Sequence, residues 1–285
     1  MMTKGNLIGV DLGGTNVRAG LIGEKGLIAQ SACQVSSSGS EEQVLQEIRE
    51  TVAEVFDDTV SGIGIGVPSV VDVDRGVVYT VENIPSWREV FLADIMEKWF
   101  KVPVQVNNDA NCFALGEFYY GSGRGYRDLL GMVVGTGLGA GLVIDGRLYC
   151  GQNCGAGEVG SIPFQGETIE YYCSGQYFSR EHGLDGAVLH ERALGGDREA
   201  REIFSEFGAY FGQALMTVLY AYDPQIIVMG GSVSKAWPFY EPAARRVLES
   251  FSYQHALARV KIVVSTVTGV ALLGAAALCL DAGKK

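Results

Sequence analysis

One short pattern occurs twice in the sequence, and this repeat constrains the fold more than any other feature. Residues 14–21 read Gly-Thr-Asn-Val-Arg-Ala-Gly-Leu, and residues 135–142 read Gly-Thr-Gly-Leu-Gly-Ala-Gly-Leu. In both copies an apolar run precedes a glycine-rich turn and a second apolar run follows it, which predicts a strand, a turn and a return strand. Two such hairpins indicate a duplicated α/β domain with two phosphate-facing turns.

The composition of both turns suits phosphate binding. Neighbouring glycines let the backbone approach a ligand closely, and several N–H groups in one turn can cradle phosphate oxygens. Asp11 ends the first strand, where its carboxylate could hold Mg²⁺, directly or through water. An ordinary hairpin would need the glycines but not the whole pattern, so it stays an alternative. The predicted nucleotide-binding residues here are Asp11, Gly13, Gly14, Thr15, Asn16, Gly135, Thr136 and Gly137.

Two common nucleotide-binding patterns are excluded. Gly135, Gly137 and Ala140 have the spacing of the dinucleotide fingerprint, but that motif requires a helix directly afterwards. The residues that follow, 140–144, are apolar and strand-like. The P-loop pattern GxxxxGK[ST] does not occur in the sequence. We therefore expect neither a Rossmann site nor a P-loop.

A third polar segment follows the apolar run 104–106. A strand that ends at Asn108 and Asp109 presents both side chains at the edge of a sheet where α/β proteins bind ligands. Asp109 could accept the proton of a substrate hydroxyl, and Asn108 could hold a neighbouring hydroxyl. Asp and Asn are also favoured helix N-caps. Taken alone, the segment leaves both catalysis and capping of a helix over 110–117 open.

Two further segments carry candidate binding residues. Glu158 and Glu170 lie among glycines and aromatic residues within 146–175. Carboxylates bind vicinal hydroxyls and aromatic faces cover C–H surfaces, although each glutamate could also be an ordinary surface charge. Gly230 and Gly231 follow a strand-like run, 225–229, and suit close approach of a base and ribose.

Hydrophobic periodicity gives the remaining elements and the domain organisation. A glycine-rich connector at 121–125 suggests a domain boundary, so we expect a first domain over 1–117, completed by 268–285, and a second over 118–267. A hairpin is expected over 72–80. Helices are expected over 41–56, 89–100, 110–117, 187–194, 198–203, 204–222 and 270–280, and strands over 7–11, 17–23, 60–67, 104–108, 129–134, 140–144, 225–229 and 262–264.

Charge and composition exclude other classes of protein. A net charge of −11 argues against nucleic acid as the main partner, because phosphate neutralisation needs a basic face. The longest apolar stretch, 270–280, is too short to span a bilayer, and no signal peptide is expected. Six cysteines form no CxxC pair, so we expect buried reduced thiols in a cytoplasmic protein.

As an ordered set, these motifs resemble those of the ROK family of bacterial sugar kinases and sugar-responsive repressors. The resemblance implies a two-domain α/β architecture, the actin/Hsp70/hexokinase-like (ribonuclease H-like) ATPase fold with an interdomain cleft. It covers nearly the whole chain. The segments that carry it are Asp11–Thr15, Gly64–Pro68, Asn83–Trp87, Asn108–Asn111, Gly135–Gly139, Ala156–Glu158, Glu170–Gly175 and Gly230–Gly231.

The resemblance also implies roles for these residues. Asp109 would be the general base for the sugar 6-hydroxyl, and this favours catalysis over capping. Glu158 and Glu170 would bind sugar, and Gly230 and Gly231 would contact adenosine. The residues expected to bind substrate are Asn108, Glu158, Glu170, Ser161 and Ser69.

This chain departs from the family pattern at three places. Ser161 stands where the family usually has a histidine that contacts sugar and binds a structural zinc. Residues 162–169 contain none of the expected zinc-binding cysteines, and Ser69 replaces a glycine. We therefore expect no structural zinc and an altered sugar contact.

The resulting prediction is an ATP- and Mg²⁺-dependent monosaccharide kinase, glucokinase-like at the 6-hydroxyl, with family members suggesting a homodimer. The alternatives are a kinase for fructose or an N-acetylhexosamine, and a non-catalytic sugar-sensing ROK protein. A repressor would need an N-terminal helix-turn-helix domain, for which the position of Asp11 leaves no room.

Overall fold

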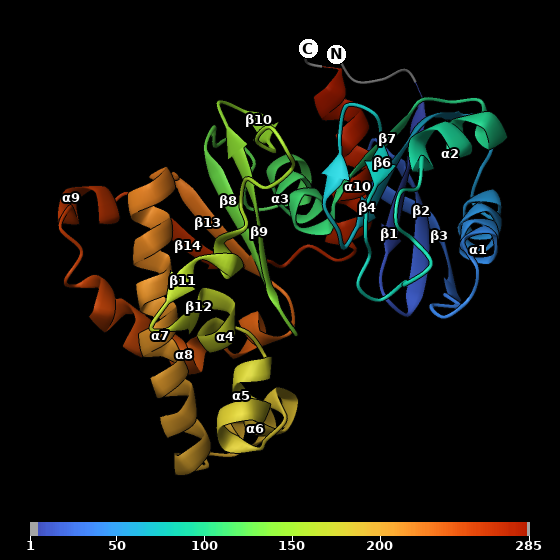
Figure 1. Cartoon of the computed structure of the whole chain (residues 1–285). Helices are drawn as coiled ribbons and strands as arrows, with labels where there is room; N and C mark the ends of the chain where they lie inside the picture. Colours follow the sequence, from blue (N-terminus) through green and yellow to red (C-terminus); the bar gives the residue numbers. More distant parts are fainter. Residues whose placement is uncertain (1–4, 284–285) are drawn as a thin grey trace. The chain divides into compact units, whose positions relative to one another are not determined.

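The computed structural model describes residues 5–283 (Figure 1). Residues 1–4 and 284–285, at the two ends of the predicted first domain, lie outside the described residues. The chain packs into two compact units. The first contains the chain up to Arg127, Gly141–Ala156 and the chain from Thr266 onward, and the second contains Asp128–Ala140 and Gly157–Ser265.

These units differ from the predicted domains in three segments, 118–127, 141–156 and 266–267, which pack with the first unit. Close backbone contacts explain why residues 141–156 pack with the first unit. A Cβ added to Gly141 would lie 2.6 Å from the carbonyl oxygen of Ala110, and the amide of Gly146 donates to the carbonyl of Arg127 at 2.8 Å. The division of the chain into folding domains at 117 and 267 stays a prediction.

The first unit is built on a five-stranded sheet with the order β3-β2-β1-β4-β7. The hairpin strands pair antiparallel, whereas β4 and β7 continue the sheet parallel to β1. The carboxyl ends of β1, β4 and β7 therefore share one edge of the sheet. The strands are β1 (Asn6–Leu12), β2 (Asn16–Gly23), β3 (Gly26–Gln34), β4 (Val60–Val67) and β7 (Val104–Asn108).

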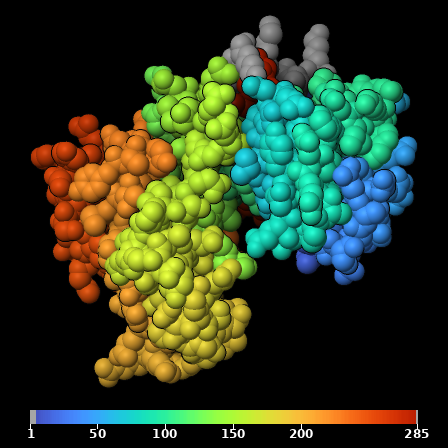
Figure 2. All heavy atoms as spheres, viewed as in Figure 1, coloured from blue at the N-terminus to red at the C-terminus, as the bar shows by residue number. Residues whose placement is uncertain are grey.

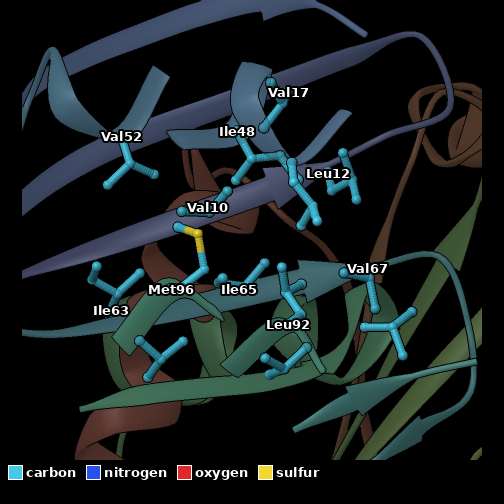
Figure 3. Close-up of a cluster of buried hydrophobic side chains, with 14 of the residues drawn as sticks. Val10, Leu12, Val17, Ile48, Val52, Ile63, Ile65, Val67, Leu92 and Met96 are labelled. Atoms are coloured by element: carbon cyan, nitrogen blue, oxygen red, sulfur yellow. The ribbon is translucent and has the colours of Figure 1, made fainter. Parts of the chain in front are cut away.

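The core of the first unit lies between one face of this sheet and helices α1 (Glu41–Ala53) and α2 (Leu92–Phe100) (Figure 3). Alternate residues of β1 point into it because successive strand side chains face opposite ways. The labelled side chains include Val10 from β1, Ile48 from α1 and Met96 from α2, all fully buried. Helix α1 begins with its N-cap Ser40, whose side chain accepts from an amide of the first turn.

Helix α10 (Val270–Ala282) covers β1 and β4 and packs along α3 (Asp109–Tyr120). Glycines make this contact possible. A Cβ on Gly9 or Gly64 would lie 1.8 Å from the carbonyl oxygen of Leu272 or Ala275. A Cβ on Gly274 would lie 1.7 Å from the carbonyl oxygen of Cys112. Side chains at these positions would therefore separate the helix from its neighbours.

The second sheet has the order β10-β9-β8-β13-β14. As in the first sheet, the strand that opens the hairpin has a parallel neighbour on its other side, since β8 pairs with β13 in parallel. The repeat in the sequence thus corresponds to a repeat in sheet order. The strands are β8 (Leu129–Val134), β9 (Leu138–Ile144), β10 (Arg147–Tyr149), β13 (Ile226–Gly230) and β14 (Lys261–Val264).

Aromatic side chains fill the interior of the second unit. Phe178, Phe207 and Tyr240 are fully buried, and the ring of Phe207 contacts the rings of the other two. Helices α5 and α6 form the part of the surface coloured yellow in Figure 2. The helices are α4 (Ile169–Cys173), α5 (Gln176–His182), α6 (Gly186–Leu194), α7 (Arg198–Tyr222), α8 (Trp237–Leu248) and α9 (Gln254–Leu257), with 3₁₀ turns at Val159–Ser161 and Val233–Ala236.

Most predicted elements are confirmed, including the hairpin of β5 (Val71–Asp72) and β6 (Val77–Val78). Helix α1 ends at Ala53 instead of 56, α3 extends to Tyr120 instead of 117, and two further expectations were wrong. Helix α7 is continuous where a break after Ile203 was expected, because Phe204 continues its buried stripe. Helix α2 begins at Leu92 instead of Glu89, because Val90 forms a β-bridge with Val78. Among the described residues, every helix is too short or too polar to cross a bilayer.

The contact between α10 and the sheet gives a stability prediction. We expect Gly64→Ala to lower the free energy of unfolding by about 1–3 kcal/mol or more, because the added methyl group overpacks a backbone contact. The matched control is Gly155→Ala, which adds a methyl group to the same unit where no atom lies within 4 Å. Urea denaturation of both variants measures the difference. Equal midpoints for Gly64→Ala and the unmodified chain would contradict the packing argument.

Candidate functional site

The carboxyl ends of β1, β4 and β7 bring three predicted site segments together in the first unit. Asp11 is paired in register with Gly66, and Gly66 with Asn107 on the next strand. A Cβ on Gly66 would lie 3.6 Å from the Cα of Asp109. Burial raises the pKa of the Cys112 thiol well above its ordinary value, and the carboxylates of Asp109 and Asp11 raise it further. Both carboxylates therefore lie near the Cys112 thiol.

Asn108, and not Asp109, is the N-cap of α3. The Asn108 side chain accepts from the amides of Ala110 at 2.9 Å and Asn111 at 3.4 Å. Asp109 is the first residue of the helix and is exposed, with one oxygen 2.8 Å from the amide of Ala110. The capping alternative thus applies mainly to Asn108, and the helix does not depend on Asp109 for its cap.

Ser69 lies next to Asn108. The side-chain Nδ2 of Asn108 donates to the Ser69 carbonyl at 3.4 Å, and the Ser69 hydroxyl donates to the carbonyl of Thr80 at 2.7 Å. These bonds tie the loop after β4 to the end of β7. The structure therefore brings together two residues that were expected to bind substrate.

The first glycine turn leaves backbone donors without acceptors. The Gly13 amide donates to the Asn16 carbonyl at 2.8 Å, which closes the turn. Among the described residues, nothing accepts from the amides of Gly14 or Thr15. The turn borders a cavity of about 480 Å³ lined by Asp11, Gly13, Thr15, Asn16, Arg18 and Ala32. Free N–H groups facing a cavity suit an anionic ligand.

Arg18 is a functional candidate that the sequence analysis missed. It lies on β2 opposite Asp11, and its guanidinium bonds to Asp11 Oδ2 at 2.6 Å. The Arg18 side chain is 59% exposed, whereas that of Asp11 is 15% exposed. Arg18 therefore holds Asp11 in place while presenting positive charge at the cavity. The antiparallel hairpin, which pairs these two positions, was the signal that could have identified it.

The second glycine turn, in the second unit, also has backbone amides without acceptors. The Gly135 amide donates to the Gly137 carbonyl at 2.9 Å, and no described residue accepts from the amides of Thr136 or Gly137. The Gly175 amide donates to the Gly135 carbonyl at 2.6 Å. Each predicted phosphate turn thus has two free amide donors in the described structure, and the threonine amide is free in both.

Glu170 supports the second turn directly. Its carboxylate accepts from the Leu138 amide at 2.7 Å, and a Cβ on Gly137 would lie 2.6 Å from Glu170 Oε2. Partial burial raises the pKa of Glu158, and the nearby charge of Glu170 raises it further. Although Glu158 reaches solvent, protein atoms thus replace part of the water around its carboxyl group. Ser161 is exposed, and its amide donates to the Glu158 carbonyl at 3.2 Å.

Gly230 and Gly231 lie at the same sheet edge as the second turn. Gly230 is paired in register with Val133 of β8. Gly231 has a φ of +87°, and a Cβ there would lie 2.3 Å from the Val134 carbonyl oxygen. Only glycine fits this position, so the backbone of the loop can approach a ligand closely.

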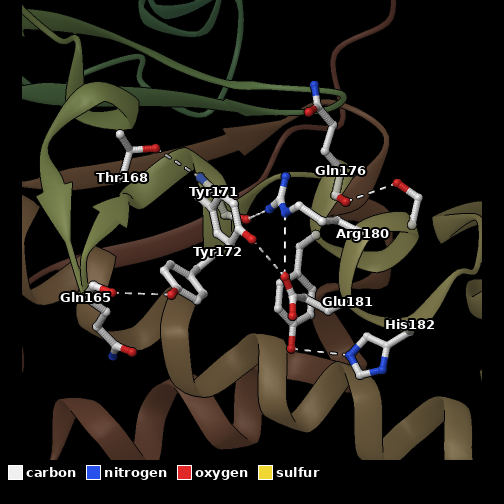
Figure 4. A network of polar contacts seen from close by, with 10 residues as sticks. Gln165, Thr168, Tyr171, Tyr172, Gln176, Arg180, Glu181 and His182 are labelled. Atoms are coloured by element: carbon white, nitrogen blue, oxygen red, sulfur yellow. Dashed lines mark hydrogen bonds and ion pairs between the residues drawn. The ribbon is translucent and has the colours of Figure 1, made fainter.

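Residues from Gln165 to His182 form a polar network (Figure 4). The Tyr171 hydroxyl donates to Glu181 at 3.1 Å, and the guanidinium of Arg180 lies 3.4 Å from the centre of the Tyr171 ring. Arg180 also donates to the Tyr171 carbonyl. Residues Pro163–Phe164 and Glu167–Thr168 form the hairpin β11–β12 where the family has its zinc-binding cysteines. The described residues include no group of three or more potential metal-binding side chains.

Comparison with known proteins identifies the family. The model of the ROK family matches residues 7–282. The chain belongs to the ROK family. Its glucokinase relative from Thermotoga maritima is 30% identical, with 88% of this chain and 90% of that protein covered. An N-acetyl-D-glucosamine kinase from Pectobacterium carotovorum is also 30% identical, over 82% of this chain and 86% of the relative.

Solved structures of ROK proteins confirm the fold. The ROK glucokinase of Streptomyces griseus, in complex with glucose and AMPPNP, superposes with a TM-score of 0.79 at 29% identity and covers 96% of this chain and 99% of its own. The ROK hexokinase of Thermus thermophilus gives a TM-score of 0.80 at 26% identity, over 98% and 100%. This ROK chain thus has the predicted actin/hexokinase-like two-domain fold.

The raised pKa of Glu158 predicts a pH-dependent stability difference. A carboxyl group with a raised folded-state pKa costs stability as pH rises from its ordinary value through the raised value. We expect Glu158→Gln to raise the Tm at neutral pH, with the gain vanishing below pH about 4.3, where glutamate is protonated in both states. Calorimetry across pH 3–8 measures this, with exposed Glu167→Gln as control. An equal gain at all pH values would contradict it.

Proposed function

We propose that this ROK protein transfers the γ-phosphate of ATP to the 6-hydroxyl of a hexose, in the manner of a glucokinase, with Asp109 as general base. The observation that carries the proposal is the position of Asp109. It is exposed at the start of α3, its capping role is taken by Asn108, and it shares a sheet edge with Asp11. The free amides of the first glycine turn follow Asp11 in the same unit.

The coarser activity, ATP-dependent phosphorylation of a sugar, is confirmed by relatives named glucokinase and N-acetyl-D-glucosamine kinase and by the ROK glucokinase complex with glucose and AMPPNP. The choice of sugar belongs to the proposal. Glucose is the first candidate because several relatives are named glucokinase. Kinases of N-acetylhexosamines among the relatives keep an acetylated sugar as the second candidate.

The proposed chemistry rests on positioning and charge. Asp109 would take the proton as the sugar hydroxyl attacks the γ-phosphate in line. Asn108 would orient that hydroxyl, because its own side chain is fixed by two amides of α3. The amides of the two glycine turns and the guanidinium of Arg18 would bind phosphate oxygens and stabilise their negative charge.

Asp11 suits a role in holding Mg²⁺. Arg18 occupies only Oδ2, and no described residue donates to Oδ1. A carboxylate oxygen beside free backbone donors has the chemistry expected of a magnesium–phosphate site. When bound, Mg²⁺ would offset the charge of the phosphates.

Glu158, Glu170, Ser161 and Ser69 would bind the sugar hydroxyls. Glu170 is fixed by its bond to the Leu138 amide, so it offers a rigid acceptor. Ser161 is smaller than the family's usual histidine, and we propose that it alters the preference at the sugar's C1 or C2 position. A cytoplasmic location, a homodimer, the predicted cleft and the absence of structural zinc stay predictions.

The function is tested by ATP consumption with Mg²⁺ across a panel of glucose, fructose, mannose and N-acetylhexosamines. On the sugar that is turned over, we expect Asp109→Asn to lower kcat by about 10²–10⁴-fold, because the amide cannot accept the proton. The substitution keeps an oxygen for the Ala110 amide, so α3 should be retained. ATP binding should also be retained.

Asp74→Asn is the matched control, since it removes an exposed carboxylate from the same unit. Near-normal turnover by Asp109→Asn would refute its role as base. Sugar binding without turnover of any sugar in the panel would favour the non-catalytic sugar-sensing alternative.

Arg18 gives a separate prediction. We expect Arg18→Gln to raise KM for ATP by about 10–100-fold, the effect of losing a hydrogen bond to a charged group, and to leave sugar affinity unchanged. Arg18→Lys should recover part of the loss, because the charge is kept but not the planar fork. Arg75→Gln, at an exposed arginine that pairs with Asp72, is the control. A change in sugar affinity alone would contradict the assignment of Arg18 to phosphate.

A further inference from the structure

Two cysteines of the first unit lie beside Asn107 and Asn111, next to the proposed general base Asp109. Cys150 and Cys154 are separated by three residues, and a hydrogen bond from the Ala156 amide to the Cys150 carbonyl, 3.1 Å long, closes the turn between them. Both cysteines are reduced. Cys150 is half-buried, Cys154 is 4% exposed, and both line a cavity of about 740 Å³.

The two sulfurs share the same pair of amide partners. Asn111 Nδ2 lies 3.8 Å from each Sγ. Asn107 Oδ1 lies 3.5 Å from the sulfur of Cys154 and 3.8 Å from that of Cys150. The neighbouring Cys154 thiol raises the pKa of Cys150, and burial raises it further. Because both sulfurs lie within 3.8 Å of the same two side-chain atoms, the two thiols are close neighbours, and disulfide closure needs them to approach further.

The backbone of the turn adds a second observation. Cys154 has a φ of +56°, a conformation that favours glycine. A non-glycine residue held there costs stability and is often found at functional sites. The strain brings the Cys154 thiol to Asn107 and Asn111, where a glycine would leave no side chain.

Asn107 and Asn111 connect the thiols to the proposed catalytic residues. Asn107 Oδ1 accepts from the backbone amide of Asn108 at 2.8 Å and from Asn111 Nδ2 at 2.9 Å. Both asparagines are almost fully buried. Movement of the sulfurs would thus reach the backbone that precedes Asp109 through a single layer of side-chain amides.

We propose that Cys150 and Cys154 are a redox-sensitive dithiol, which a low-molecular-weight disulfide oxidises to an intramolecular disulfide that shifts the Asn107–Asn111 pair. The part of this proposal that concerns catalysis rests on the proposed function. The thiolate of Cys150, which borders the cavity, attacks the small disulfide RSSR and releases one RSH. Cys154 then attacks the Cys150 sulfur and releases the second RSH. Two thiols lose two electrons and two protons, and RSSR becomes two RSH.

Bond formation changes the contacts of the asparagines. Both thiols lose the hydrogens that they donate to Asn107 Oδ1, and the sulfurs must approach to about 2.05 Å. The turn that holds Cys154 must therefore move relative to Asn107. Since a displacement of about 1 Å at a positioned group can cost up to about 10²-fold in rate, we expect oxidation to lower kcat several-fold or more. The raised pKa of Cys150 makes the reaction slow at neutral pH, because thiolate is the attacking form.

The test is incubation of the full chain with oxidised and reduced glutathione at graded ratios, followed by alkylation and digestion after arginine and glutamate. Cleavage after Arg147 and Glu158 yields the peptide 148–158, which contains Cys150 and Cys154 but not Cys173. We expect this peptide to become two hydrogens lighter and to resist alkylation. Kinase activity should fall over the same range of ratios and return with dithiothreitol.

Hydrogen exchange at the amides of residues 108–111 provides a readout that does not depend on activity. We expect faster exchange in the oxidised protein. Cys150→Ser should abolish both responses, measured against its own reduced state. Cys154→Gly should do the same, and it suits the positive φ, so it guards against misfolding of the first variant. Cys279→Ser, a thiol of α10 in the same unit, should keep both responses.

Several results would overturn the proposal. One is full alkylation of the 148–158 peptide at every ratio. Another is a stable glutathione adduct on Cys150, or a bond that joins Cys112 instead. Disulfide formation without a change in exchange at residues 108–111 would refute the coupling to the catalytic segment. If the reduced protein phosphorylates no sugar, the proposed function fails, while peptide mass and hydrogen exchange still decide the dithiol.

Discussion

Backbone contact between α10 and the first sheet is the constraint on which the first unit depends. Gly9 and Gly64 sit on neighbouring strands, and each faces a carbonyl of the helix at a distance that no side chain could fill. Gly274 of the helix meets α3 in the same way. Because helix, strands and α3 touch through backbone, their relative positions are fixed by atoms that cannot change rotamer. The carboxyl ends of β1 and β7, and with them Asp11 and Asp109, are thereby held in place.

Asn107, Asn108 and Asp109, at the end of β7 and the start of α3, each have a different role. Asn107 is buried and binds the Asn108 amide and the Asn111 side chain. Asn108 caps α3, and Asp109 remains exposed at its first turn. A helix N-terminus favours a negative charge, so the first turn of α3 suits an aspartate at this position. The local sequence thus satisfies the helix and presents a carboxylate at the same position.

Much of the fold and most candidate site residues could be predicted, for identifiable reasons. Strands β1, β4 and β8 are apolar runs that end in glycine or proline, and a short-range pattern suffices to locate them. Strand β3 was missed because its side chains are mostly exposed, including Ile28 at 60%, so it lacks the alternation of a half-buried strand. Arg18 was missed because its contact with Asp11 depends on hairpin register, which a motif of adjacent residues does not contain.

The cysteines show where sequence reasoning ends. The spacing of three residues between these thiols is not the CxxC pattern, and the six cysteines were expected to be buried reduced thiols. Only the turn, with Cys154 in a glycine-like conformation, places the two sulfurs on the same two amides. Had the turn used glycine at 154, Cys150 would have been a single thiol with no partner for disulfide closure. The strained backbone and the paired thiols are thus one feature, and its position beside Asn107 makes the segment before Asp109 responsive to it.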